Sequence, residues 1–160
     1  MEGFKEVIDK YQSDAFTDDA MHALAMLHIK RREWVAAEKV LFRYLENKKL
    51  NNHNPEVWYN LGLARENQQN YVGDRSAISA YSKVWGKYAG HFKFSCPAMN
   101  RSIEIESKHG IKQSAYGLAD KWLQRMAKHT NHEVAGDHLR KTRSLHQDLA
   151  NDPSVTVEDD

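Results

Sequence analysis

Histidine is the residue type in this sequence with the most evident capacity to bind a metal ion. There are nine histidines among 160 residues. His129 and His132 stand three residues apart, but Asn131 is expected to interrupt the helix between them, and no H-E-x-x-H or H-x-H pattern occurs. A metal site needs converging ligands and groups that orient them. We therefore predict no metal site, and we expect the histidines to be spread over helix surfaces and interfaces.

Nucleophilic chemistry has one candidate thiol, Cys96, which precedes Pro97 at an expected helix start. A helix N-terminus can lower the pKa of a thiol, but a nucleophile also needs a positioned base, and the sequence offers none. We expect Cys96 to be a small buried or capping residue. The chain also lacks a P-loop, a G-x-G-x-x-G motif and a G-x-S-x-G motif. We predict a non-catalytic protein without a cofactor.

Charge is balanced over the whole chain, with 23 basic and 22 acidic side chains and a net charge of +1. No general attraction to nucleic acid or to a membrane follows from this balance. The distribution is uneven, however, because residues 87–143 carry eleven Lys or Arg against five acids. One explanation of this asymmetry is that solvent-exposed basic and acidic helix faces offset each other's charge. The alternative is a regulatory or nucleic-acid-associated protein that uses this basic segment.

Composition indicates a globular chain, since 41% of the residues are apolar, 28% are charged and only three are proline. The length predicts one domain over 1–150, and we expect 151–160 to be an acidic disordered tail. A single cysteine excludes an internal disulfide and favours a reducing compartment, which we expect to be the cytoplasm. No apolar run of 18 residues occurs, so no membrane-spanning helix is expected.

Apolar residues recur with a helical period along nearly all of the chain, and no segment shows the alternation of a strand. The sequence Asn54-Pro55-Glu56 is a strong start signal, with a capping side chain before a proline at the first helical position. Eight helices are expected. The first four are Phe4–Tyr11, a helix from Thr17 to near Arg31, Val35–Leu45, and a helix that starts at Asn54. The last four are a helix that starts at Gly73-Asp74 with Trp85 on its buried side, one that starts at Pro97, one over residues 112–128, and one that starts at Asn131.

An internal repeat is visible when the chain is compared with itself. A shift of 37 residues places Met21 on Trp58, Leu24 on Leu61, Ala25 on Gly62 and Trp34 on Tyr71. A shift of 40 places Ala37 on Ala77 and Leu41 on Tyr81, so three inserted residues are expected in the second turn, around Val72-Gly73-Asp74. One helical hairpin cannot bury its own apolar face, whereas stacked hairpins can.

The segment from Pro55 to Trp85 resembles a tetratricopeptide repeat (TPR). Trp58, Leu61-Gly62, Tyr71, Ala77 and Tyr81 stand at packing positions of that family, whereas Arg65 occupies a position that is usually aromatic. A weaker copy covers 18–51, and a third, near 95–128, would depend on Met99, Ile103 and Ile105, which match poorly. The resemblance implies an all-α, TPR-like helical-hairpin solenoid with an N-terminal helix and a C-terminal capping helix near 132–149.

The same resemblance implies a binding surface, because the first helix of each hairpin lines a concave groove in that family. The matching positions are His22, Met26, Ile29, Tyr59, Leu63 and Glu66, with Asn60 beside them. This mixed surface suits a peptide or protein segment and predicts an adaptor or chaperone, and the layout resembles the small type III secretion chaperones. A clamp for a peptide carboxylate is not supported, since Asn60 alone fits it. The N-terminal helix or a second subunit, as in a homodimer, is the alternative occupant of this face.

Overall fold

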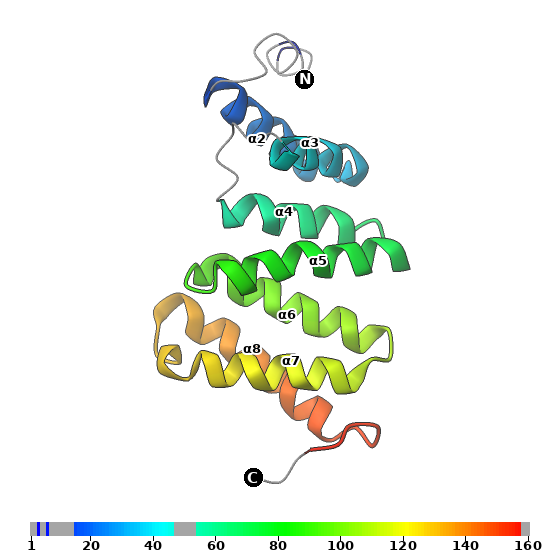
Figure 1. Cartoon of the computed structure of the whole chain (residues 1–160), viewed down its shortest axis with the longest axis vertical. Helices are drawn as coiled ribbons and strands as arrows, with labels where there is room; N and C mark the ends of the chain where they lie inside the picture. Colours follow the sequence, from blue (N-terminus) through cyan, green and yellow to red (C-terminus); the bar gives the residue numbers. More distant parts are fainter. Residues whose placement is uncertain (1–2, 4–5, 7–14, 47–53, 158–160) are drawn as a thin grey trace. The chain divides into compact units, whose positions relative to one another are not determined.

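The computed structural model describes residues 3, 6, 15–46 and 54–157 and divides the chain into two compact units, Met1–Ala80 and Tyr81–Asp160. The described residues form seven α-helices and one short 3-10 helix and contain no strand (Figure 1), which confirms the all-α class. The boundary between the units falls inside one helix. The single domain over 1–150 therefore stays a prediction, and the expected helix Phe4–Tyr11 lies almost entirely outside the described residues.

The first unit consists of three helices and the beginning of a fourth: α2 (Ala15–Lys30), α3 (Trp34–Glu46), α4 (Pro55–Glu66) and the first part of α5 (Tyr71–Lys87). Helix α3 contacts both α2 and α4. These helices enclose one core, and Trp58 packs against it as a partly buried side chain. The buried residues of this core are Ala20, Met21, Leu24, Ala25, Leu41, Tyr44, Val57, Leu61 and Ala80. Five residues of the repeat register are therefore buried in this core: Met21, Leu24, Ala25, Leu41 and Leu61.

The second unit contains the rest of α5, α6 (Phe92–Lys108), α7 (Lys112–Arg125), the 3-10 helix η1 (Ala127–His129) and α8 (Glu133–Ala150). Helices α6, α7 and α8 contact one another pairwise. Their common core is built around Met99, Ile103, Trp122 and Leu139. Helices α6 and α7 pack against each other over the range where a third copy, near 95–128, was considered, and the last helix packs on both of them.

Several of the predicted helix starts are displaced, while one is confirmed in detail. Asn54 caps α4 by accepting a hydrogen bond from the Glu56 N–H at 2.9 Å, with Pro55 at the first helical position. Helix α2, by contrast, begins at Ala15, two residues before the start expected at Thr17. Helix α8 is capped by His132, whose Nδ1 accepts from the N–H groups of the second and third helical residues at 3.2 and 3.4 Å. The expectation of Asn131 as this cap was wrong by one residue.

Helix α6 begins at Phe92, five residues before the start that Pro97 suggested. Proline is favoured in the first turn of a helix, which is why the sequence pointed to this residue. The helix accommodates Pro97 near the end of its second turn, and the Ser95 hydroxyl in the turn before it donates to the Ala89 carbonyl at 2.8 Å. Cys96 is consequently an interior helical residue and is fully buried.

The two helices of each hairpin are joined by turns that share one backbone feature. The residue two positions before the second helix has a left-handed φ, of 59° at Arg32, 57° at Gln69 and 78° at Gly110. Each of these residues donates its N–H to the carbonyl three residues earlier, at 2.9, 3.1 and 3.0 Å respectively. The hairpins α2–α3, α4–α5 and α6–α7 therefore end their first helix in a similar way, as helices commonly do.

The three inserted residues of the second copy lie inside helix α5 and not in the turn before it. The helix starts at Tyr71, whereas its first buried apolar side chain is Ala77. Tyr71 and Val72 belong to this additional turn and are 60% and 75% exposed, so the expected packing role of Tyr71 was wrong. The backbone at Gly73 comes so close to α4 that an added Cβ would lie 2.5 Å from the Arg65 carbonyl oxygen. The lengthened helix thus requires a glycine at this contact.

The segment after α8 was expected to be a disordered tail, but its described part lies against α7. The Lys112 ammonium donates to an Asp152 carboxylate oxygen at 2.5 Å. Gln113 forms two hydrogen bonds with the backbone of Thr156, at 2.7 and 3.1 Å. Residues 151–157 are therefore tied to the beginning of α7, and the tail prediction differs from the structure over this range.

Candidate binding surface

The predicted groove residues lie on two helices of the first unit. Helix α2 carries His22, Met26 and Ile29, and α4 carries Tyr59, Leu63 and Glu66. Both sets follow the spacing i, i+4, i+7, which places each set on one helix face. All six residues have partly or largely accessible side chains, and Met26 is 37% exposed. Two equivalent faces of mixed apolar and polar character are thus presented by successive hairpins.

A contact between Met26 and Asn60 joins these two faces. The Asn60 Nδ2 group donates to the Met26 sulfur at 3.3 Å, across 34 residues of sequence. Asn60 itself is only 6% exposed, so we expect it to position Met26 and not to touch a partner. The structure therefore brings residues of both predicted helices together, with Asn60 beneath the surface and not on it.

Part of the α2 face is covered by the chain itself. Ile29 packs against the core of the first unit. The Nε2 atom of His22 is buried and has no hydrogen-bond partner among the described residues. A buried polar atom without a partner is costly, so a partner or water molecule is expected to satisfy it. Met26, Tyr59 and Leu63 consequently form the part of the surface best suited to contact another molecule.

Arg65, which departs from the family pattern, connects three helices. Its Nε donates to a Glu38 carboxylate oxygen at 2.9 Å, its Nη1 donates to the Ser76 carbonyl at 3.2 Å, and its guanidinium lies 6.0 Å from the centre of the Phe42 ring. The Gln68 amide donates to the other Glu38 oxygen at 2.5 Å. These contacts hold α3, α4 and α5 in register where an aromatic residue was expected.

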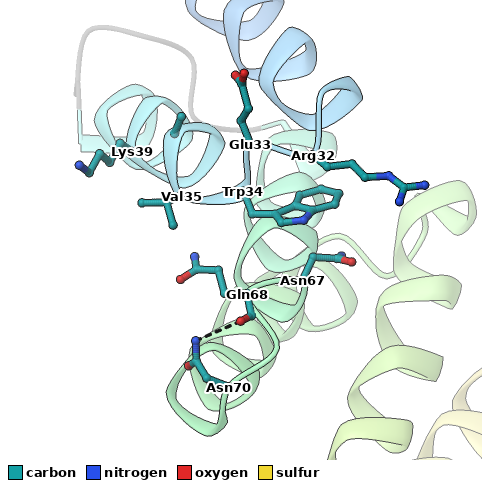
Figure 2. Close-up of a pocket in the computed structure, with 9 residues that line it drawn as sticks. Arg32, Glu33, Trp34, Val35, Lys39, Asn67, Gln68 and Asn70 are labelled. Carbon is teal, nitrogen blue, oxygen red and sulfur yellow. Dashed lines mark hydrogen bonds between the residues drawn. The ribbon is translucent and has the colours of Figure 1, made fainter.

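A pocket of about 710 Å³ lies between the α2–α3 turn and the α4–α5 turn (Figure 2). None of the seven predicted surface residues contributes to it; its lining consists of Arg32, Glu33, Trp34, Val35, Ala36, Lys39, Asn67, Gln68 and Asn70. This pocket was not predicted from the sequence, because its lining comes from two separate segments, 32–39 and 67–70, and neither carries a motif. The basic run Lys30-Arg31-Arg32 in the first turn was the available signal.

The basic segment 87–143 uses several of its cations within the second unit. Lys141 pairs with Glu104 at 2.6 Å, Arg140 pairs with Asp137, and Lys112 pairs with Asp152. The Arg125 guanidinium donates to the Trp85 carbonyl at 3.3 Å and lies over the Trp122 ring. Ion pairs of this kind are expected where basic and acidic helix faces offset each other's charge. They reduce the positive charge that is available to an acidic ligand.

Cys96 and His28, which carry a thiol and an imidazole, are buried packing residues. Cys96 is fully buried, and burial raises the pKa of its thiol, which disfavours the nucleophilic thiolate. His28 is 6% exposed, and its Nδ1 donates to the Glu33 carboxylate at 2.5 Å. Within the described part of the chain, no group of three or more His, Cys, Asp or Glu residues is arranged to hold a metal ion.

Comparison with protein-family models, with curated proteins and with solved structures found no match to this chain. The described helices include none that is long and apolar enough to span a bilayer.

Proposed function

We propose that the protein is a non-catalytic interaction module, a TPR-like adaptor or chaperone that binds a peptide or protein segment on the faces of α2 and α4. The main support is the Met26–Asn60 contact, because it joins two equivalent helix faces into one surface. Accessible aliphatic side chains beside an aromatic residue are typical of anchoring positions in interfaces. Met26, Tyr59 and Leu63 are the proposed anchors, and His22 and Glu66 are the proposed edges.

A TPR-like solenoid is the architecture that we propose for the three hairpins. Their turns share a left-handed residue two positions before the second helix. The buried residues of α3 and α7 are also equivalent, since Ala37, Leu41 and Tyr44 correspond to Ala115, Ala119 and Trp122 at a constant shift of 78 residues. A repeated turn and a repeated buried face support a repeat protein. The single free cysteine supports a reducing location, which we propose is the cytoplasm.

Affinity capture with partner identification by mass spectrometry tests this function. The immobilised full chain should retain a protein that the variant Tyr59→Ala/Leu63→Ser does not retain. A matched control, Lys121→Glu/Arg143→Glu, changes two exposed cations of the second unit and should retain the same protein. Helical circular dichroism of both variants should equal that of the parent. If the control loses the captured protein and the Tyr59/Leu63 variant keeps it, the proposed surface is wrong.

A further inference from the structure

The pocket between the first two turns has features of a ligand site that the proposed function does not use. It lies at the ends of the hairpins, and its residues come from the beginning of α3 and from both turns (Figure 2). Its volume of about 710 Å³ falls within the range of sites that hold small ligands or short peptide segments. The features that could select a ligand are its charge and its apolar wall.

The charge available in this pocket is positive. Arg32 and Lys39 are exposed, and the structure shows no ion pair or hydrogen bond of either side chain with the described residues. The single acid of the lining, Glu33, already accepts a hydrogen bond from His28 at 2.5 Å. A ligand with negative charge is therefore favoured over a neutral or basic one.

The polar amides of the lining are largely occupied by the chain. Asn67 donates to the Leu63 carbonyl at 2.8 Å, Gln68 donates to Glu38 at 2.5 Å, and Asn70 donates to the Gln68 carbonyl at 3.3 Å. The amide donors of these side chains are thus used within the α4–α5 turn and its contact with α3, and they are not available to a ligand. The cations are left as the groups that would pair with an anionic ligand.

An apolar wall separates the two cations. The Trp34 indole lies across the middle of the pocket with Val35 beside it, and Arg32 and Lys39 extend toward opposite ends (Figure 2). Val35 is 54% exposed. A small compact anion such as phosphate could not contact both cations and also cover this wall. An extended chain with an apolar side chain between acidic ones matches the arrangement.

We propose that this pocket binds an acidic peptide segment of a partner protein, with an apolar side chain on Trp34 and Val35 and carboxylates at Arg32 and Lys39. The site goes beyond the α2–α4 face and shares no residue with it. The two surfaces can therefore be tested separately, and either can fail without the other.

Fluorescence polarisation with the full chain tests the proposal, using a fluorescein-labelled peptide Glu-Asp-Leu-Asp-Glu and its neutral isostere Gln-Asn-Leu-Asn-Gln. The acidic peptide should bind at least about tenfold more tightly, and a rise in salt from about 0.05 M to 0.5 M should reduce this difference. The variant Arg32→Asn/Lys39→Gln should lose the preference. Asparagine tolerates the left-handed backbone of Arg32, so this substitution should not unfold the turn.

Three controls make the result specific. The variant Lys30→Gln/Arg31→Asn removes the same charge from neighbouring residues outside the lining and should bind within about twofold of the parent. Tyr59→Ala/Leu63→Ser should leave binding of the peptide unchanged. Replacing leucine by alanine in the peptide should weaken binding to the parent but not to Trp34→Ala, because the two changes remove the same contact.

Several outcomes would overturn the proposal. One is equal binding of the acidic and neutral peptides, and another is undiminished binding by Arg32→Asn/Lys39→Gln. Binding of a labelled oligothymidylate as tight as that of the acidic peptide, with the same sensitivity to Arg32 and Lys39, would show an anion site without peptide preference. Loss of binding in the Lys30/Arg31 control as large as in the pocket variant would show general attraction to the basic turn.

Discussion

Arg32 and Gln69 adopt the same left-handed backbone conformation, with φ angles of 59° and 57°, and stand 37 residues apart. This separation equals the shift at which the first helices of the two hairpins align in sequence. Neither residue is a glycine, although glycine is the residue that most readily adopts this conformation. The two turns therefore share a backbone conformation at the spacing of the sequence repeat, although their residues at this position differ.

Replacing Gln69 by glycine should stabilise the first unit. The substitution removes the unfavourable contact of a Cβ atom at positive φ, and the larger entropy of the unfolded glycine offsets part of the gain, which leaves about 0.5–1 kcal/mol. Urea unfolding followed by circular dichroism measures the change. Lys83→Gly, at an exposed position inside α5, should instead destabilise by about 1 kcal/mol. Equal destabilisation by both variants would contradict the left-handed turn.

Gly73→Ala should destabilise the protein although alanine is the better helix former. An added Cβ would lie 2.5 Å from the backbone oxygen of Arg65, and relieving that overlap must move α5 away from α4. We expect a loss of about 1–3 kcal/mol in the free energy of unfolding. Gly117→Ala is the matched change, because no atom lies within 4 Å of its added Cβ in α7, and it should stabilise by up to about 1 kcal/mol. A stabilised Gly73→Ala variant would mean that the two helices are further apart than described.

Substitution of two aromatic residues, Trp58 and Tyr71, tests which of them packs in the core of the first unit. Trp58 packs against the core of the first unit, whereas Tyr71 is 60% exposed. Trp58→Ala should cost about 3 kcal/mol, and Tyr71→Ala should cost less than about 1 kcal/mol. Thermal and urea unfolding of the two variants would show the difference. Similar losses for both would place Tyr71 in the core, as the sequence repeat had suggested.

The contacts that hold residues 151–157 against α7 should weaken in acid. Hydrogen bonds from Lys112 and Ser154 hold the pKa of the Asp152 carboxyl well below its usual value. A lowered carboxyl pKa stabilises the folded arrangement at every pH above the unfolded value of about 4, and this stabilisation is lost as the pH falls further toward the folded value. The protection of the Thr156 amide against hydrogen exchange should therefore decrease below about pH 4.

Asp152→Asn provides the control for this pH dependence. It removes the titrating group, so the protection of the Thr156 amide should already be low at neutral pH and should change little with acid. High salt should reduce the protection in the parent, since the pair lies at the surface. Unchanged protection of Thr156 in the parent down to about pH 2 would show that the Gln113 contacts suffice without the ion pair.

The sequence predicted the helices well, because their apolar period directly records which face is buried. Asn54 was identified correctly, since a capping side chain followed by proline is a purely local signal. Pro97 misled the prediction, because the rule for proline describes a preference that tertiary packing can override. Tyr71 was misplaced for another reason: the shift of 37 aligns it with Trp34, but the additional turn of α5 moves it out to solvent.

The binding surfaces were predictable only in part. The residues on the faces of α2 and α4 could be named in advance because the family resemblance implies a groove lined by the first helix of each hairpin. The burial of Asn60 and its contact with the Met26 sulfur depend on how two helices pack, which no local pattern encodes. The pocket beside Trp34 is formed by two turns that are distant in sequence, and it becomes visible only when the first unit is folded.

Site-specific photo-cross-linking tests the central claim most directly. A benzoylphenylalanine at position 63, on the proposed face of α4, should give one dominant protein adduct in an extract of the source cells, and mass spectrometry should locate it on a defined segment of that partner. The same group at position 83, an exposed position on α5 outside the face, should give none. Adducts from position 83 with none from position 63 would contradict a binding surface on α2 and α4.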